Sequence, residues 1–141
     1  MGLFRNEKRD VEEALEGLLG NIGANYRFHE GVDASPSVRE RAAKVKAAAE
    51  KMRAKGKDRE LEAVVAAWYE KPPPASVVFR GDSGGVAEEL ARQEGLWADV
   101  DRELPPVAGS GPKAEAEEAR RDEIAKMRAA RDYWRSVLAG L

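Results

Sequence analysis

Apolar residues recur three and four positions apart along most of this chain, which is the spacing of one face of an α-helix. The clearest stripe is Val11, Leu15, Leu18 and Ile22, and two glycines punctuate its end. Pro72 stops a later stripe, because proline supplies no amide donor and clashes with the preceding turn. The pattern predicts a mainly α fold of about five helices, over residues 7–22, 35–55, 58–71, 82–100 and 113–139.

Two short segments and a linker interrupt the helical pattern. Residues 25–29 alternate aromatic and polar side chains, and residues 76–80 hold two valines and a phenylalanine, so the pattern predicts one or two short strands, the clearer of them at residues 76–80. Residues 105–112 are rich in proline and glycine, which is typical of a linker. We therefore expect a helical region over residues 1–104, this linker, and a C-terminal helix within residues 113–141.

The composition leaves little apolar material for a core. Leu, Ile, Val and Phe together make up about a fifth of the chain, near the lower limit for a chain that fills its own core. The net charge is only −2, so self-repulsion does not force disorder. We therefore expect part of the apolar surface to be buried against other protein subunits, in a homo-oligomer or a hetero-oligomer.

The last predicted helix is uneven along its length. Residues 114–123 contain no large apolar side chain, whereas the second half is rich in them. Its apolar stripe is the candidate interface, made of Ile124, Met127, Trp134, Val137, Leu138 and Leu141. Two arrangements stay open: the stripe docks on a partner, or it folds back onto Leu15, Leu18 and Trp68 and closes a bundle.

A basic stretch is the strongest functional signal. Residues 35–59 carry nine basic and three acidic side chains, a net charge of +6, whereas residues 75–104 carry three arginines and seven acids, a net charge of −4. A basic helix can follow the phosphates of a nucleic acid; alternatively, its charge complements the acidic segment of this chain or of a neighbour. The candidate nucleic-acid contacts are Arg39, Arg41, Lys44, Lys46, Lys51, Arg53, Lys55 and Lys57.

One short string resembles a catalytic motif. Gly81-Asp82-Ser83-Gly84-Gly85 is similar to the string around the nucleophile of the chymotrypsin-like serine proteases, and on that resemblance Ser83 would be the nucleophile and His29, the only histidine, its base. That family builds its triad on β-barrels, whereas this chain is short and predominantly helical. We interpret the string as a tight turn in which Asp82 or Ser83 caps the next helix.

The remaining sequence contains no recognisable catalytic or metal-binding pattern. It has no cysteine, which excludes disulfides, thiolate zinc sites and cysteine nucleophiles. We expect no cofactor, metal or small-molecule substrate.

The sequence also indicates where the protein is located and what kind of function it has. No apolar run approaches the ~18 residues of a membrane span, and no signal peptide is evident, so we expect a cytoplasmic location or a particle assembled in the cytoplasm. We hypothesise that the chain is a non-enzymatic interaction protein, that is, an adaptor or structural subunit of an assembly such as a phage particle. A nucleic-acid-binding accessory protein is the alternative.

Overall fold

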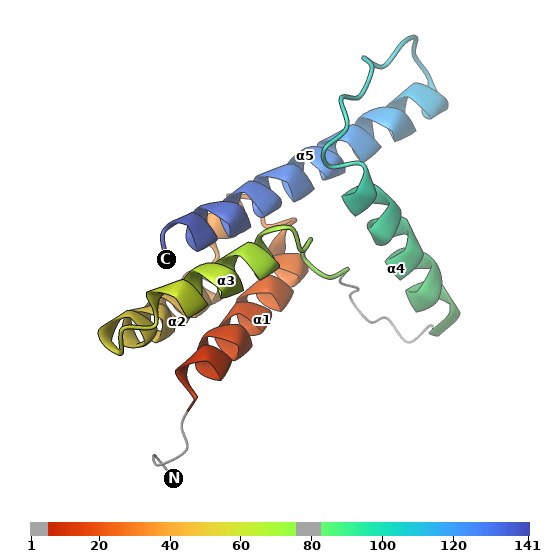
Figure 1. Ribbon diagram of the computed structural model, residues 1–141. Coiled ribbons are helices and arrows are strands. Elements are labelled where there is room, and N and C mark those ends of the chain that lie inside the picture. Colours follow the sequence, from red (N-terminus) through yellow and green to blue (C-terminus); the bar gives the residue numbers. More distant parts are fainter. Residues whose placement is uncertain (1–5, 76–82) are drawn as a thin grey trace.

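The computed structural model describes residues 6–75 and 83–141, except for the side chains of residues 83 and 84, and it is mainly helical (Figure 1). Its elements are α1 (Glu7–Asn25), the short 3-10 helix η2 (Val32–Ala34), α2 (Pro36–Ala54), α3 (Asp58–Tyr69), α4 (Ser83–Ala98) and α5 (Pro112–Ala139). The predicted fold class and the long C-terminal helix are confirmed. None of the described helices has the length and apolar character that crossing a bilayer requires.

No strand forms over residues 25–29, so that prediction is wrong. α1 continues through Asn25, and turns follow it. The alternation of aromatic and polar side chains has another cause, because Tyr26 is buried edge-on against Trp97, with 5.6 Å between the ring centroids. The second predicted strand, over residues 76–80, lies outside the described residues.

The helix boundaries follow local signals in the sequence. The Asn6 side chain accepts a hydrogen bond from the backbone N–H of Arg9, at 3.3 Å, and so caps α1. Pro36 occupies the first turn of α2, where its missing N–H costs no intrahelical bond. α3 ends at Tyr69, three residues before the first proline of the predicted stop.

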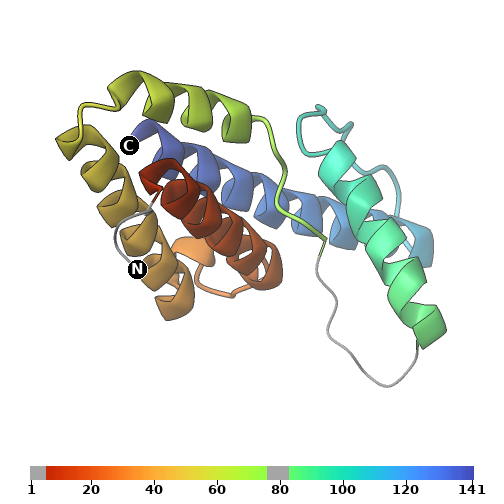
Figure 2. The same ribbon diagram turned by 60° about the horizontal axis from the view of Figure 1, so that its bottom comes forward.

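The main core lies where α1, α2 and α3 surround the C-terminal half of α5 (Figure 2). Each of the four helices turns an apolar stripe inward, as the periodicity predicts. The buried side chains at the centre are Val11, Leu15, Leu18 and Ile22 of α1, Val38, Val45 and Met52 of α2, Leu61 and Val64 of α3, and Ile124, Met127, Trp134 and Leu138 of α5.

A glycine of α1 lets the extended segment after α3 cross it closely. A Cβ atom at Gly23 would lie 2.3 Å from the carbonyl oxygen of Pro74, nearer than two such atoms approach. Glycine is therefore required at this crossing, which directs the chain from α3 towards α4.

α4 lies beside the N-terminal half of α5, away from α2 and α3 (Figures 1 and 2). The turn after α4 is fixed by Arg128 of α5, whose guanidinium donates to the carbonyl oxygens of Val100 and Arg102 at 2.8 and 3.1 Å. One long helix therefore contacts both α4 and the α1–α3 bundle.

Candidate interaction surface

The structure has the second arrangement considered for the C-terminal helix, because α5 packs within its own chain. Trp134 is fully buried, and its indole N–H donates to the carbonyl oxygen of Trp68 at 3.2 Å. The two rings meet edge-on, with 6.3 Å between their centroids. Of the candidate interface residues, Ile124, Met127, Trp134 and Leu138 are buried, and Val137 and Leu141 are half-buried. Most of the predicted interface is therefore core.

An open groove remains between α3 and the C-terminal end of α5. It has a volume of about 480 Å³, and Tyr69 at its edge is 37% exposed. Its apolar walls are formed by Leu61, Val65, Ala66, Tyr69, Leu138, Ala139 and Leu141, and its charged rim by Arg53, Asp58 and Glu62. The sequence signal for it is the pair Val65 and Tyr69, four residues apart on α3, which widens the apolar stripe of α3 beyond the buried Leu61.

The basic candidates lie on α2 and in the turn after it, and they divide into two rows. Because a helix rotates by about 100° per residue, positions 39, 46 and 53 share one side of α2, and positions 41, 44 and 51 lie on the opposite side. The contacts agree with this division. Lys44 and Lys51 line a cleft against α1, whereas Arg53 lines the groove beside α5.

Three lysines, one on the α1 side of α2 and two in the turn after it, are paired with acidic side chains. Lys57 and Lys55 approach the Glu7 carboxylate at 3.2 and 3.6 Å, and Lys44 approaches Glu40 of its own helix at 3.7 Å. The pKa of Glu7 is lowered, first by a hydrogen bond from its own backbone amide and then by Lys57. The expected complement, the acidic segment 75–104, is therefore not what neutralises these lysines.

The opposite row, Arg39, Lys46 and Arg53, has no ion pair with any side chain in the described ranges. All three side chains are exposed. Glu50 is the acidic residue of α2 nearest to them around the helix. Arg41 and Lys51 on the other side also form no ion pair within the described ranges, so neither side of α2 is fully neutralised.

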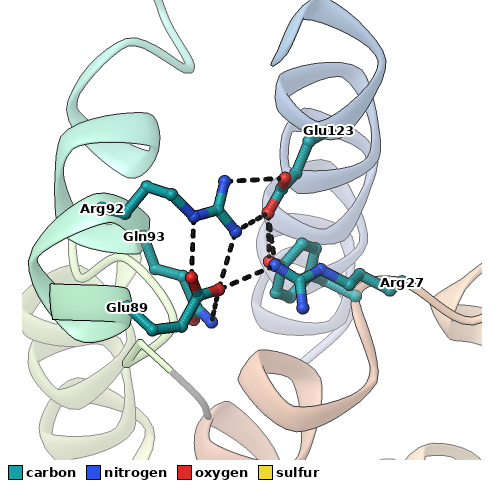
Figure 3. Close-up of polar contacts among 6 residues, drawn as sticks. Arg27, Glu89, Arg92, Gln93 and Glu123 are labelled. Atoms are coloured by element: carbon teal, nitrogen blue, oxygen red, sulfur yellow. Dashed lines mark hydrogen bonds and ion pairs between the residues drawn. The ribbon is translucent and has the colours of Figure 1, made fainter. Parts of the chain in front are cut away.

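A cluster of charges that the sequence did not reveal joins α4, α5 and the end of α1 (Figure 3). The Glu123 carboxylate of α5 accepts from Arg27 at 2.6 Å, from Arg92 at 3.0 and 3.1 Å, and from the hydroxyl of Tyr26 at 2.7 Å. Glu89 of α4 accepts from the same two arginines at 2.7–3.2 Å. Two cations and two anions thus satisfy one another and tie the three helices together.

The hydrogen bonds in this cluster set its pKa values. Burial by itself would raise the pKa of Glu123, but the bonds from Arg92, Arg27 and Tyr26 outweigh it and hold that pKa at about 2. The bonds from Arg92 hold the pKa of Glu89 at about 2 as well. Burial and the bond to Glu123 raise the pKa of the Tyr26 hydroxyl. Both carboxylates are therefore ionised at neutral pH. In this state they can hold the helices together through ion pairs but cannot donate a proton.

We expect Glu123→Gln to lower the free energy of unfolding by about 1.5–3 kcal/mol at pH 7, the contribution typical of hydrogen bonds to a charged group. Both folded-state pKa values lie below the ordinary 4.5, so the stabilisation is full above pH 4.5 and is lost as the pH falls towards 2. Urea unfolding between pH 7 and pH 2.5 measures both effects.

The control for this prediction is Glu13→Gln, which removes an exposed pair with Arg9 on α1. Exposed pairs contribute little, so the control should change stability by less than about 1 kcal/mol. The Glu123→Gln variant should also lose less stability on acidification than the unmodified protein. Equal acid sensitivity of the two would contradict the assigned role of this carboxylate.

The catalytic resemblance gains no support from the residues that can be described. His29 is exposed in the turn after α1, and α4 begins at Ser83, whose side chain lies outside the description. Asp82, the other proposed cap, also lies outside it. In the portions that the structure describes, no three histidine or acidic side chains gather as metal ligands would.

No protein-family model, curated protein or solved structure matches this chain.

Proposed function

We propose that this protein is a non-enzymatic helical interaction protein, an adaptor or structural subunit of a larger assembly, which binds an amphipathic helix of a partner protein in the groove between α3 and α5. The groove carries this proposal: it is apolar, about 480 Å³ in volume, and edged by an exposed tyrosine. The other large apolar stripes of the described helices are turned into the core. In the groove, Val65, Tyr69 and Leu141 keep apolar surface open to solvent, and an exposed apolar strip of this kind marks a binding surface.

The dimensions of the groove suit a helix. Its α3 wall extends from Asp58 to Tyr69, and at ~1.5 Å per residue this length accommodates about three helical turns. An extended peptide binds most readily by joining a sheet edge, and the described residues form no sheet. A partner helix with anchors at i, i+4 and i+7 would meet Val65 and Tyr69 on the α3 wall and Leu141 on the α5 wall.

Charge and rigidity specify the partner further. Asp58 and Glu62 lie on the rim against one cation, Arg53, so the partner helix should carry lysine or arginine beside its apolar face. The guanidinium of Arg135 stacks over the Tyr69 ring, 4.9 Å from its centroid. A ring held in place loses little entropy on binding, and aromatic residues of this kind commonly dominate interfaces.

Site-specific photo-crosslinking tests the proposal. We expect a benzophenone side chain at Ala66, inside the groove, to form an adduct in the native host with an amphipathic helix that carries basic residues. Mass spectrometry of the crosslinked peptide identifies that segment. The matched control is the same side chain at Ala63, which is exposed on α3 but does not line the groove.

Two results would contradict the proposed function. One is an equal yield of adduct from positions 63 and 66, which would show random capture. The other is an adduct at position 66 that contains only a second copy of this chain, because the groove would then be a homodimer contact.

A further inference from the structure

We infer that the partner helix carries a carboxylate that binds the guanidinium of Arg135, at the Tyr69 end of the groove. This inference rests on the proposed function and adds a second charge that the partner must present. Arg135 lies one helical turn before Ala139, so it continues the α5 wall of the groove. Asp58 and Glu62 lie in the first half of α3, whereas Tyr69 is its last residue. The groove therefore selects a helix that is basic at one end and acidic at the other.

Arg135 differs from its neighbours on α5 in how its charge is met. On the same side of the helix, Arg128 bonds two backbone carbonyl oxygens and Arg131 contacts two aspartates. Arg135 has one acidic contact among the described residues, Glu70 at 3.4 Å, and its buried Nε–H has no acceptor there. Its side chain is only 25% exposed, so water solvates the charge poorly, and a half-buried cation of this kind is stabilised by a further anion.

The contact with Glu70 leaves room for a second carboxylate. Its length exceeds the usual range of about 2.7–3.2 Å, and the Glu70 side chain is 78% exposed, so the pair contributes little. One guanidinium can bond two carboxylates at once, as Arg92 does with Glu89 and Glu123. A carboxylate of the partner can therefore bind Arg135 without displacing Glu70.

Tyr69 holds the guanidinium in a favourable orientation. The Arg135 guanidinium carbon lies 4.9 Å from the centroid of the ring. A guanidinium stacked on a ring keeps its N–H groups in its own plane, where one carboxylate can accept two of them. The other arginine beside the groove, Arg53, stacks on no ring among the described residues and lines the groove with Asp58 and Glu62. Arg135 is therefore the arginine suited to a carboxylate of the partner.

Fluorescence anisotropy with two synthetic helical peptides tests the inference. Both peptides have ~16 residues, enough to span the groove, with leucines at helical spacing and lysines in the last turn. One carries glutamate in its first turn, which suits the helix dipole, and the other carries glutamine. We expect the full chain to bind the glutamate peptide about ten-fold more tightly. In Arg135→Gln, the difference between the peptides should shrink to less than about two-fold.

The matched control is Arg53→Gln, which removes the same charge from the other end of the groove and should keep the preference for glutamate. Circular dichroism checks that the variants remain helical. If Arg135→Gln unfolds, Arg135→Lys replaces it. Lysine keeps the charge but not the planar fork, so the preference should fall to about three-fold or less.

Failure of this inference differs from failure of the proposed function. The inference alone is overturned if both peptides bind equally and Ala66→Trp, which fills the groove, abolishes both. It is also overturned if the preference for glutamate survives in Arg135→Gln, or if the segment crosslinked at position 66 carries basic residues but no acidic one. If neither peptide binds, the groove does not accept a helix, and the proposed function falls as well.

Discussion

Replacing Trp134 by alanine is expected to lower the free energy of unfolding by about 3–5 kcal/mol, a loss typical of a fully buried tryptophan. The side chain lies at the centre of the core, and its N–H is the hydrogen-bond donor to the Trp68 carbonyl oxygen. Removing it leaves a cavity and a carbonyl group without its indole donor. Total stabilities are commonly only 5–15 kcal/mol, so the melting temperature should fall by at least 10 °C or so.

Two companion variants separate the causes of that loss. Trp134→Phe keeps most of the ring but loses the N–H bond, and should have an intermediate effect. Phe28→Ala removes an aromatic side chain that is 39% exposed in a turn, and should cost much less than Trp134→Ala. Thermal melts of the three variants compare these losses of stability. A Trp134→Ala protein as stable as the Phe28→Ala protein would show that α5 is not anchored in the core.

Local signals allowed much of the fold to be predicted from the sequence. Capping residues, prolines and the 3.6-residue period act within one helix, so they located the α-helices α1–α5 to within a few residues, but not the short 3-10 helix η2. The false strand at residues 25–29 shows the limit of this approach. Tyr26 is turned inward because it packs on Trp97 of α4, 71 positions away, and the sequence contains no local signal for such a contact.

The candidate surfaces could be predicted only in part, for the same reason. The sequence identified the basic stretch of residues 35–59, but not that Glu7 of α1 pairs with two of its lysines, because Glu7 and Lys57 meet only after the chain has folded back. The cluster around Glu123 was also missed, since Arg27 lies 96 positions from it. The small number of apolar residues suggested burial in a partner, whereas the fold concentrates them in its own core.

Removing residues 112–141 is expected to unfold the remainder of the chain. The truncation takes four large buried side chains out of the core, namely Ile124, Met127, Trp134 and Leu138. At roughly 1.5–3 kcal/mol each, their loss is comparable to the total stability of a domain of this size. It also removes Glu123, and with it the main tie between α4 and α1.

The fragment 1–111 should therefore show low helicity and no cooperative melt by circular dichroism. Isolated helices of this length are marginal in water because nucleation is unfavourable, so they depend on packing to persist. Adding a peptide of residues 112–141 in excess should restore helicity beyond the sum of the two parts, since the apolar stripe of α5 provides the missing wall of the core. A fragment that keeps a cooperative melt without the peptide would instead identify α5 as a detachable arm, the other arrangement that the sequence permits.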